Sequence, residues 1–204
     1  MRRMLALPIL LALPLVVAAQ PDDINYLYLE LGYGQTELDV AGPDIEGNGL
    51  SLEGSVPIRE HIHVFGGYGA LEFDGIADAD SVEKLFGVGT NFSFFDEKLS
   101  VYGRLGFIDA DIDIGAGNVE DDGLFASGGV RYMPLPGWEI RGGFEHVDLD
   151  LAGSDTAAVI GSDLFVTDVV ALTIKLKDND DASSIAIGAR FYFGNEAPPA
   201  SFGR

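Results

Sequence analysis

The sequence predicts an all-β fold, a closed antiparallel up-and-down transmembrane β-barrel of ten strands, with eight strands as the alternative count. Three observations lead to this prediction. The chain starts with an export signal, the following segments alternate apolar and polar side chains, and the remainder contains no apolar stretch of about 18 residues that could form a membrane helix. Alternation with a period of two is typical of a strand with one buried face, and tilted strands of about ten residues span a bilayer.

The first segment has the features of a cleavable secretory signal. Arg2 and Arg3 precede an apolar run, residues 4–17, which is followed by small residues up to Ala19. This run is short for a transmembrane helix and contains two prolines, which disfavours a helix retained in the membrane. We therefore expect a signal peptide over 1–19, a barrel over 20–194 and a short tail over 195–204.

Charge and cysteine content exclude several classes of function. Loss of the signal peptide leaves 10 basic and 33 acidic residues, a net charge of −23. Such a charge repels the phosphates of nucleic acids, so no nucleic acid is expected as a partner, and it attracts cations. The chain has no cysteine, which excludes disulfides, a lipid anchor on a cysteine and thiol chemistry.

Alternation and turn residues together define the predicted strands. The eighth alternates weakly, which is the reason for the eight-strand alternative. The predicted strands are Asn25–Thr36, Gly49–Pro57, Ile62–Phe73, Val82–Phe95, Leu99–Ile108, Gly123–Met133, Trp138–Val147, Ala157–Val166, Val169–Lys177 and Ser183–Phe193.

The alternation also predicts which side chains face the lumen. In the strand 169–177, Val170 and every second residue to Leu176 face lipid, which turns Lys175 inward. In the strand 62–73 both faces carry apolar residues, so the sequence leaves its register open.

Ten charged residues fall on the predicted lumen face. Because unpaired charges in a low-dielectric interior are costly, we expect each base to pair with an acid. A small barrel is just wide enough to be filled by its own side chains, so a structural plug is the favoured interpretation, and a narrow conduction path through the same groups is the alternative. The basic members are Arg104, Arg131, Arg141, Lys175 and Arg190, and the acidic members are Glu30, Glu53, Glu139, Glu145 and Asp163.

The connections between predicted strands form a short class and a longer, acidic class. The longer connections contain nineteen carboxylates and no lysine or arginine. In transmembrane barrels long loops are extracellular and short turns periplasmic, which predicts that both chain ends are periplasmic. The acidic loops either bind divalent cations that bridge to the phosphates of lipopolysaccharide, or form a solvated surface. The longer connections are Glu37–Asn48, Asp74–Ser81, Asp109–Asp122, Asp148–Thr156 and the tighter Asp178–Ala182.

One of these connections has the ligand spacing of a calcium loop. Asp109, Asp111 and Asp113, with Glu120 at the twelfth position, match the oxygen ligands of an EF-hand. The match is incomplete, because Ile114 occupies the position of the turn glycine. The alternative is a strand that protrudes from the membrane with one aspartate-bearing face. Apart from this possible Ca²⁺, the sequence indicates no cofactor.

The histidines give little support to catalysis. A barrel hydrolase needs a histidine near a carboxylate or a serine. His61 and His63 lie by a predicted short turn, and His146 lies on the lipid-facing side near the outer end of its strand. The sequence therefore predicts no enzyme, and a barrel enzyme is the least favoured alternative.

The first and last strands carry a resemblance to a known family. The segments 24–33 (INYLYLELGY) and 188–193 (GARFYF) resemble the small porin-like outer-membrane β-barrels of Gram-negative bacteria, the group that includes the OmpA transmembrane domain and OmpX. The resemblance implies that the barrel-assembly machinery reads Phe191 and Phe193 as its signal. The family includes structural proteins, adhesins, narrow channels and a few enzymes, so it implies a fold and no single function.

These observations together predict a monomer in the outer membrane, in contact with its lipid and lipopolysaccharide. Its expected role is structural or in surface interaction, with a filled polar lumen and acidic extracellular loops. A narrow porin-like channel for small solutes is the main alternative.

Overall fold

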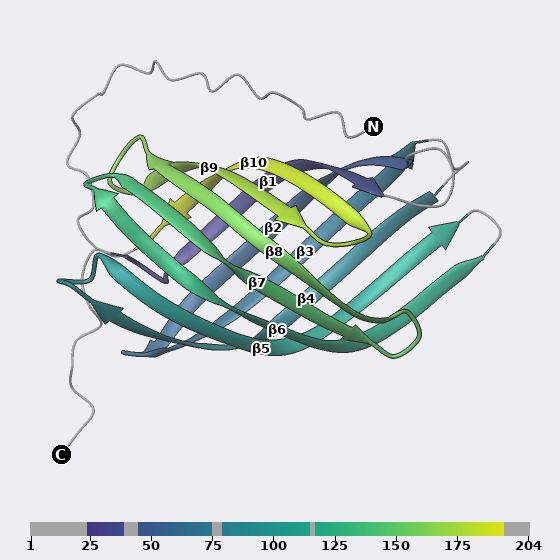
Figure 1. The fold of residues 1–204 in the computed structure, drawn as a ribbon, viewed down its shortest axis with the longest axis horizontal. Helices are drawn as coiled ribbons and strands as arrows, with labels where there is room; N and C mark the ends of the chain where they lie inside the picture. The colour runs from purple at the N-terminus through teal and green to yellow at the C-terminus, as the bar shows by residue number, and fades with distance from the viewer. Residues whose placement is uncertain (1–23, 39–44, 75–78, 115–116, 194–204) are drawn as a thin grey trace.

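The computed structural model describes residues 24–38, 45–74, 79–114 and 117–193. Within these residues ten antiparallel strands form a closed barrel, in which each strand pairs with its neighbours in sequence and β1 pairs with β10 (Figure 1). The described residues include no helix that is long and apolar enough to cross a membrane. The strands are β1 (Tyr28–Leu38), β2 (Ile45–Arg59), β3 (Ile62–Asp74), β4 (Ala79–Phe94), β5 (Leu99–Ile114), β6 (Asn118–Leu135), β7 (Trp138–Leu149), β8 (Gly153–Phe165), β9 (Val170–Asp178) and β10 (Ala182–Tyr192).

The predicted fold class and strand count are confirmed. The weakly alternating eighth segment is a full strand of 13 residues, paired with β7 from Trp138↔Leu164 to Leu149↔Gly153. The eight-strand alternative is therefore wrong. The predicted signal peptide and the tail after Gly194 lie outside the described residues.

The two ends of the barrel differ in their connections. At one end, the turn end, lie residues 60–61, 95–98, 136–137 and 166–169, together with the start of β1 and the end of β10. At the other, the loop end, lie the ends of β1, β3 and β5, the starts of β2, β4 and β6, and residues 150–152 and 179–181.

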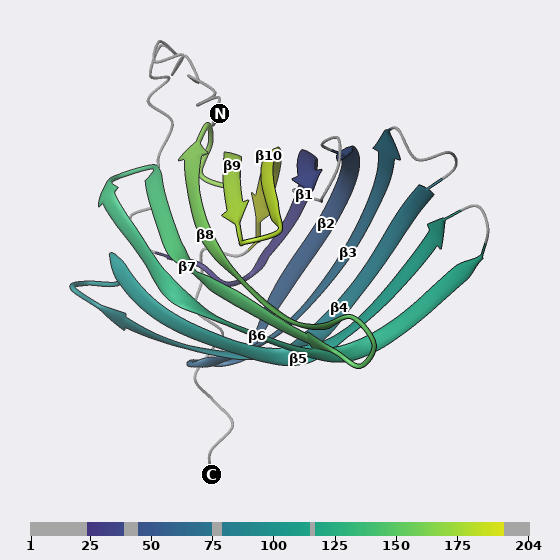
Figure 2. The same cartoon turned by 45° about the vertical axis from the view of Figure 1, so that its right-hand side comes forward.

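The predicted long loops need a correction, because strands replace most of their length. The segment Asp109–Asp122 is largely a hairpin, in which β5 continues to Ile114 and β6 starts at Asn118. Acidic residues are depleted from strands, which is why the segment was expected to be a loop. The alternative, a protruding strand with one aspartate-bearing face, is the one that the structure confirms, because Asp109, Asp111 and Asp113 lie on the same face of β5. The asymmetry lies instead in strand length: β4, β5 and β6 have 16, 16 and 18 residues, whereas β9 has 9. Figure 2 shows these long strands extending well beyond β9 and β10.

Alternation sets the inner and outer faces as predicted in the unambiguous strands. In β10 the inward Arg190 is 4% exposed, whereas the outward Ile187 is 60% exposed. In β3, where the sequence left the register open, His63 and Phe65 are buried and Val64 faces outward. Apolar residues occupy both faces there because part of the lumen is itself apolar.

The lumen contains two apolar clusters beside its charged groups. One, near the turn end, consists of Tyr28, Met133, Phe165, Ala171 and Tyr192. The other, on the β3 to β7 side, consists of Phe65, Ile108 and Phe125, with Leu85, Val147 and Leu149 packed against it. Charged side chains contact both clusters: Arg190 lies 4.3 Å from the ring centre of Tyr28, and Arg104 lies 5.1 Å from that of Phe65.

Candidate functional site

The ten predicted lumen residues are brought together inside the barrel. They come from eight of its strands, all except β3 and β4. Strand β7 supplies three of them, Glu139, Arg141 and Glu145, because residues two or four apart on a strand share a face.

Arg131 and Glu139 form one of the two most buried ion pairs, the other being Arg190 with Asp163. The Arg131 Nε atom lies 2.7 Å from Glu139 Oε1, and its Nη2 atom donates to Oε2 at 2.9 Å. The two residues are 3% and 1% exposed. Two parallel hydrogen bonds to one carboxylate are the strongest arrangement available to arginine. Each charge therefore compensates the other where water does not reach.

Next to this pair, two arginines share two carboxylates. The Arg190 Nε donates to Glu30 Oε2 at 2.7 Å, and its Nη1 donates to Asp163 Oδ2 at 2.8 Å. Arg141 Nη1 donates to the same Asp163 oxygen at 3.0 Å, and its Nη2 lies 3.6 Å from Glu30 Oε2. The four side chains form a closed ring that links β1, β7, β8 and β10. Loss of one arginine leaves the other in contact with both acids.

A third cluster includes a tyrosine that the sequence analysis did not identify. Tyr28 donates its hydroxyl hydrogen to Glu53 Oε1 at 2.6 Å and accepts from Arg104 Nη2 at 2.7 Å. Arg104 Nη1 also donates to Glu53 Oε1, at 2.9 Å. The guanidinium lies 5.1 Å from the ring centre of Phe65, within range of a cation–π contact. The sequence contained a signal that could have identified Tyr28, since it is a tyrosine in the inward register at the turn end of a strand.

The remaining pairs involve Glu145 and two lysines of β9. Lys177 Nζ lies 3.1 Å from Glu145 Oε2, and Lys175 Nζ lies 3.7 Å from Oε1. All three side chains are partly exposed: Lys177 is 36% exposed, Lys175 is 30% exposed and Glu145 is 21% exposed. These are the most hydrated pairs of the lumen.

The segment before β1, residues 24–27, crosses the lumen at the turn end, and we call it the N-terminal strap. The predicted first strand starts at Asn25, whereas β1 starts at Tyr28. The Leu27 carbonyl still accepts a bond from Phe193 N at 3.0 Å, but Ile24 N donates to Glu97 O, in the turn between β4 and β5, at 3.4 Å. Within three residues the chain passes from the wall at β10 to that turn.

The strap contacts the far wall through side chains as well. The Tyr26 hydroxyl lies 3.0 Å from Ser100 Oγ of β5, and its ring stacks on His63 of β3 at 4.8 Å between ring centres. Arg131 Nη1 donates to the Asn25 carbonyl at 3.0 Å. His63, which the sequence analysis placed beside a turn, is fully buried under the strap. These contacts close part of the opening at the turn end.

Little space remains among the charged groups. A cavity of about 40 Å³ is lined by side chains of all four groups of lumen charges, among them Glu53, Arg104 and Arg141. A water molecule needs at least about 10 to 15 Å³ measured in this way, so the cavity has room for a few waters. The lumen is a packed polar core with a small hydrated space.

The predicted calcium residues lie on a strand pair. Asp109, Asp111 and Asp113 alternate along β5, and Glu120 of β6 lies opposite Asp111. The loop that would wrap a cation is therefore replaced here by extended backbone. In the described part of the chain, no group of three or more histidine or acidic side chains is placed to hold a metal ion. Lys84 Nζ lies 2.8 Å from Asp109 Oδ1 on the same outer face.

The other residues singled out from the sequence lie on the outside of the wall. His146 Nδ1 lies 2.7 Å from Thr156 Oγ1 at the surface, and His61 lies 3.8 Å from the carboxylate of Glu60. Phe191 lies on β10 and Phe193 directly follows it, 50% exposed. Their proposed recognition by the assembly machinery stays a prediction.

Comparison with known proteins identifies the fold family. A family model for the outer membrane protein β-barrel domain matches residues 7–193. Among curated proteins, no significant match is found.

Several solved structures are similar in fold. The KdgM porin in complex with disordered oligogalacturonate shares 10% identity, with a TM-score of 0.46, over 82% of this chain and 100% of that one. Ail, the attachment invasion locus protein of Yersinia pestis, shares 18% identity, with a TM-score of 0.42, over 81% and 97%. The outer membrane phospholipase of Salmonella typhi, a dimer with bound calcium, shares 10% identity, with a TM-score of 0.41, over 81% and 91%.

Proposed function

We propose that this chain, which belongs to the outer membrane protein β-barrel domain family, works as a plugged barrel with a structural or surface-interaction role. It is an integral outer-membrane β-barrel protein. In this role the lumen of the barrel does not conduct ions across the outer membrane.

The single observation that carries the proposal is the interlocking of the lumen charges. The ring of Arg190, Glu30, Arg141 and Asp163 ties four strands together across the barrel, and the cavity left beside it measures about 40 Å³. A continuous water path would require these groups to separate, which exposes buried charges without partners. The N-terminal strap adds a second obstruction at the turn end.

The proposed orientation places the loop end outside the cell and the turn end in the periplasm. About 9 to 11 residues of a tilted strand cross a bilayer, so strands of 16 to 18 residues protrude by roughly 5 to 9 residues. The protruding part of β5 and β6 carries the acidic side chains, which suits a solvated surface rather than a membrane. We propose that this acidic hairpin presents the barrel to external partners.

Conductance in planar bilayers tests the plugged barrel. The refolded mature protein should give no steps above background. A variant that removes one whole cluster without leaving an unpaired charge, Tyr28→Ala with Glu53→Ala and Arg104→Ala, should give steps. The matched control is Leu105→Ala, an outward residue beside Arg104, which should stay silent. Steps from the unmodified protein would contradict the proposal.

A narrow porin-like channel is the second candidate, because the remaining cavity is lined by charged groups of both signs. In that case the unmodified protein would conduct, and Lys175→Gln would alter its ion selectivity. The most hydrated pairs, those of Glu145 with the two lysines, are the place where water would pass first.

A further inference from the structure

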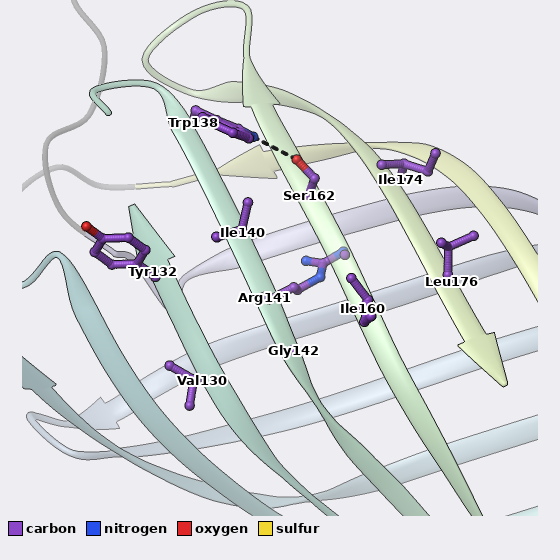
Figure 3. Close-up of a pocket in the computed structure, with 11 residues that line it drawn as sticks. Val130, Tyr132, Trp138, Ile140, Arg141, Gly142, Ile160, Ser162, Ile174 and Leu176 are labelled. Atoms are coloured by element: carbon purple, nitrogen blue, oxygen red, sulfur yellow. Dashed lines mark hydrogen bonds between the residues drawn. The ribbon is translucent and has the colours of Figure 1, made fainter. Parts of the chain in front are cut away.

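The outward face of β6, β7, β8 and β9 contains a hollow of about 530 Å³ (Figure 3). It is larger than the cavity in the lumen and opens on the opposite side of the wall. Its lining is almost entirely apolar: Val130, Tyr132, Trp138, Ile140, Gly142, Ile160, Ser162, Ile174 and Leu176, with Arg141 and Gly161 behind them.

The strand register explains why the wall is hollow at this place. Gly142 lies opposite Val130 on one side and Ile160 on the other, and Ser162 lies opposite Ile140 and Ile174. The two small residues are thus diagonal neighbours within a lattice of large outward side chains. A Cβ added at Gly142 would meet only the Val159 carbonyl oxygen, at 4.0 Å. Because Gly142 and Ser162 fill so little space, a groove runs between Ile140 and Ile160.

The polar group in the groove is already satisfied. Trp138 Nε1 donates to Ser162 Oγ at 2.9 Å, along the dashed line in Figure 3. A hydroxyl or indole N–H facing hydrocarbon is costly unless it is hydrogen-bonded, and here each compensates the other. What the groove presents to a ligand is therefore hydrocarbon.

We propose that this groove binds one acyl chain of a membrane phospholipid. The wall belongs to an outer-membrane barrel, so the medium against it is lipid, and the apolar lining between Ile140 and Ile160 matches the chemistry of a hydrocarbon chain. An unfilled void in an apolar wall loses dispersion contacts on every side, and a chain restores them. A second copy of the barrel presents a convex wall, which does not fill a groove.

Binding in the groove can be followed by the fluorescence of Trp138, because it is the only tryptophan in the chain. The refolded protein in detergent is titrated with phosphatidylcholine that carries bromine on its acyl chains, and Trp138 fluorescence is followed. Quenching should saturate at about one lipid per barrel. Quenching that grows in proportion to the lipid fraction, without saturation, would overturn the proposal.

Two glycine variants separate the groove from general contact with lipid. Gly142→Leu fills the groove and should weaken the saturable quenching by about tenfold or more. Gly103→Leu is the matched control: it is also outward on its strand, and its added Cβ meets only Ser127 O at 4.0 Å. This variant should behave like the unmodified protein, and an equal loss in both variants would refute the site.

Native mass spectrometry distinguishes the occupants. One retained phospholipid on the unmodified protein, lost in Gly142→Leu, is the expected result. A dimer that Gly142→Leu dissociates would instead show that a second copy covers the groove, and would overturn the lipid proposal.

Discussion

Carboxylates occupy two regions of this barrel, and their surroundings differ completely. In the lumen, Glu139 is 1% exposed and accepts hydrogen bonds from Nε and Nη2 of Arg131. On the protruding hairpin of β5 and β6, Asp111 lies directly opposite Glu120, another acid. The same functional group is paired inside and faces a like charge outside.

The difference follows from the dielectric surroundings. Two unit charges about 4 Å apart interact with about 1 kcal/mol in water and about 4 kcal/mol at the effective dielectric constant of a protein surface. Water therefore makes a row of like charges tolerable on the hairpin. In the lumen the loss of hydration adds several kcal/mol per ion, so each acid needs a base within reach. Burial, rather than charge, decides where pairing is obligatory.

The largest effect is expected from breaking the buried pair of Arg131 and Glu139. Arg131→Leu leaves the Glu139 carboxylate buried without its two donors, and should lower the free energy of unfolding by about 3 to 5 kcal/mol. Urea unfolding of the refolded barrel in lipid vesicles measures this change.

The double variant Arg131→Leu with Glu139→Leu checks the cause. Because it removes both charges, it should recover most of the loss, since replacing a buried ion pair by apolar residues is often neutral. If the double variant is as unstable as the single one, the loss reflects the strap contact at Asn25 or packing, not the unpaired charge.

A smaller effect is expected from Arg141→Leu, despite the same chemical change. Its two acidic partners, Glu30 and Asp163, both keep Arg190, so neither is left alone. We expect a loss of about 1 to 2 kcal/mol, within the usual range for a single substitution. Ile140→Val, on the outward face of the same strand, should change stability by less than about 0.5 kcal/mol. If Arg141→Leu were as damaging as Arg131→Leu, the ring would not be redundant.

The lumen side of this comparison was accessible from the sequence. Alternation in β10 turns Arg190 inward, and the same rule on β7 turns Glu139 and Arg141 inward, because a strand has only two faces. Which acid each arginine contacts was not accessible, since the tilt of the strands brings together residues that are far apart in the chain. The bonds from Arg104 to Glu53 and to Tyr28 are examples.

The outer side of the comparison was harder to predict. The hairpin of β5 and β6 was expected to be a loop, because acidic residues are typical of loops, although the aspartates at every second position from Asp109 to Asp113 left a protruding strand as the alternative. The inward position of His63 and Phe65 was not determined, because Ile62 and Val64 on the opposite face are equally apolar. Sequence periodicity shows which face of a strand points inward only where the two faces of that strand meet different surroundings.

The smallest effect is expected on the hairpin. Asp111→Asn removes one of two like charges that lie directly opposite each other, and should raise the free energy of unfolding by up to about 0.5 kcal/mol at low salt. Asp109→Asn is the matched control, because Asp109 faces Asp122 but also contacts Lys84, so the gain should be smaller or absent. The expected sign is the reverse of that in the lumen, where the loss of a single charge destabilises.

Added salt should affect the exposed hairpin and the buried ion pairs differently. Calcium chloride and sodium chloride at matched ionic strength should raise the melting temperature of the barrel equally, because exposed like charges are relieved by screening alone. The gain from Asp111→Asn should vanish in about 1 M salt, where the screening length falls to about 3 Å. Arg131→Leu should stay equally destabilising in that salt, because buried charges are screened much less. An increment specific to calcium that Asp111→Asn abolishes would instead favour a bound ion between Asp109 and Glu120.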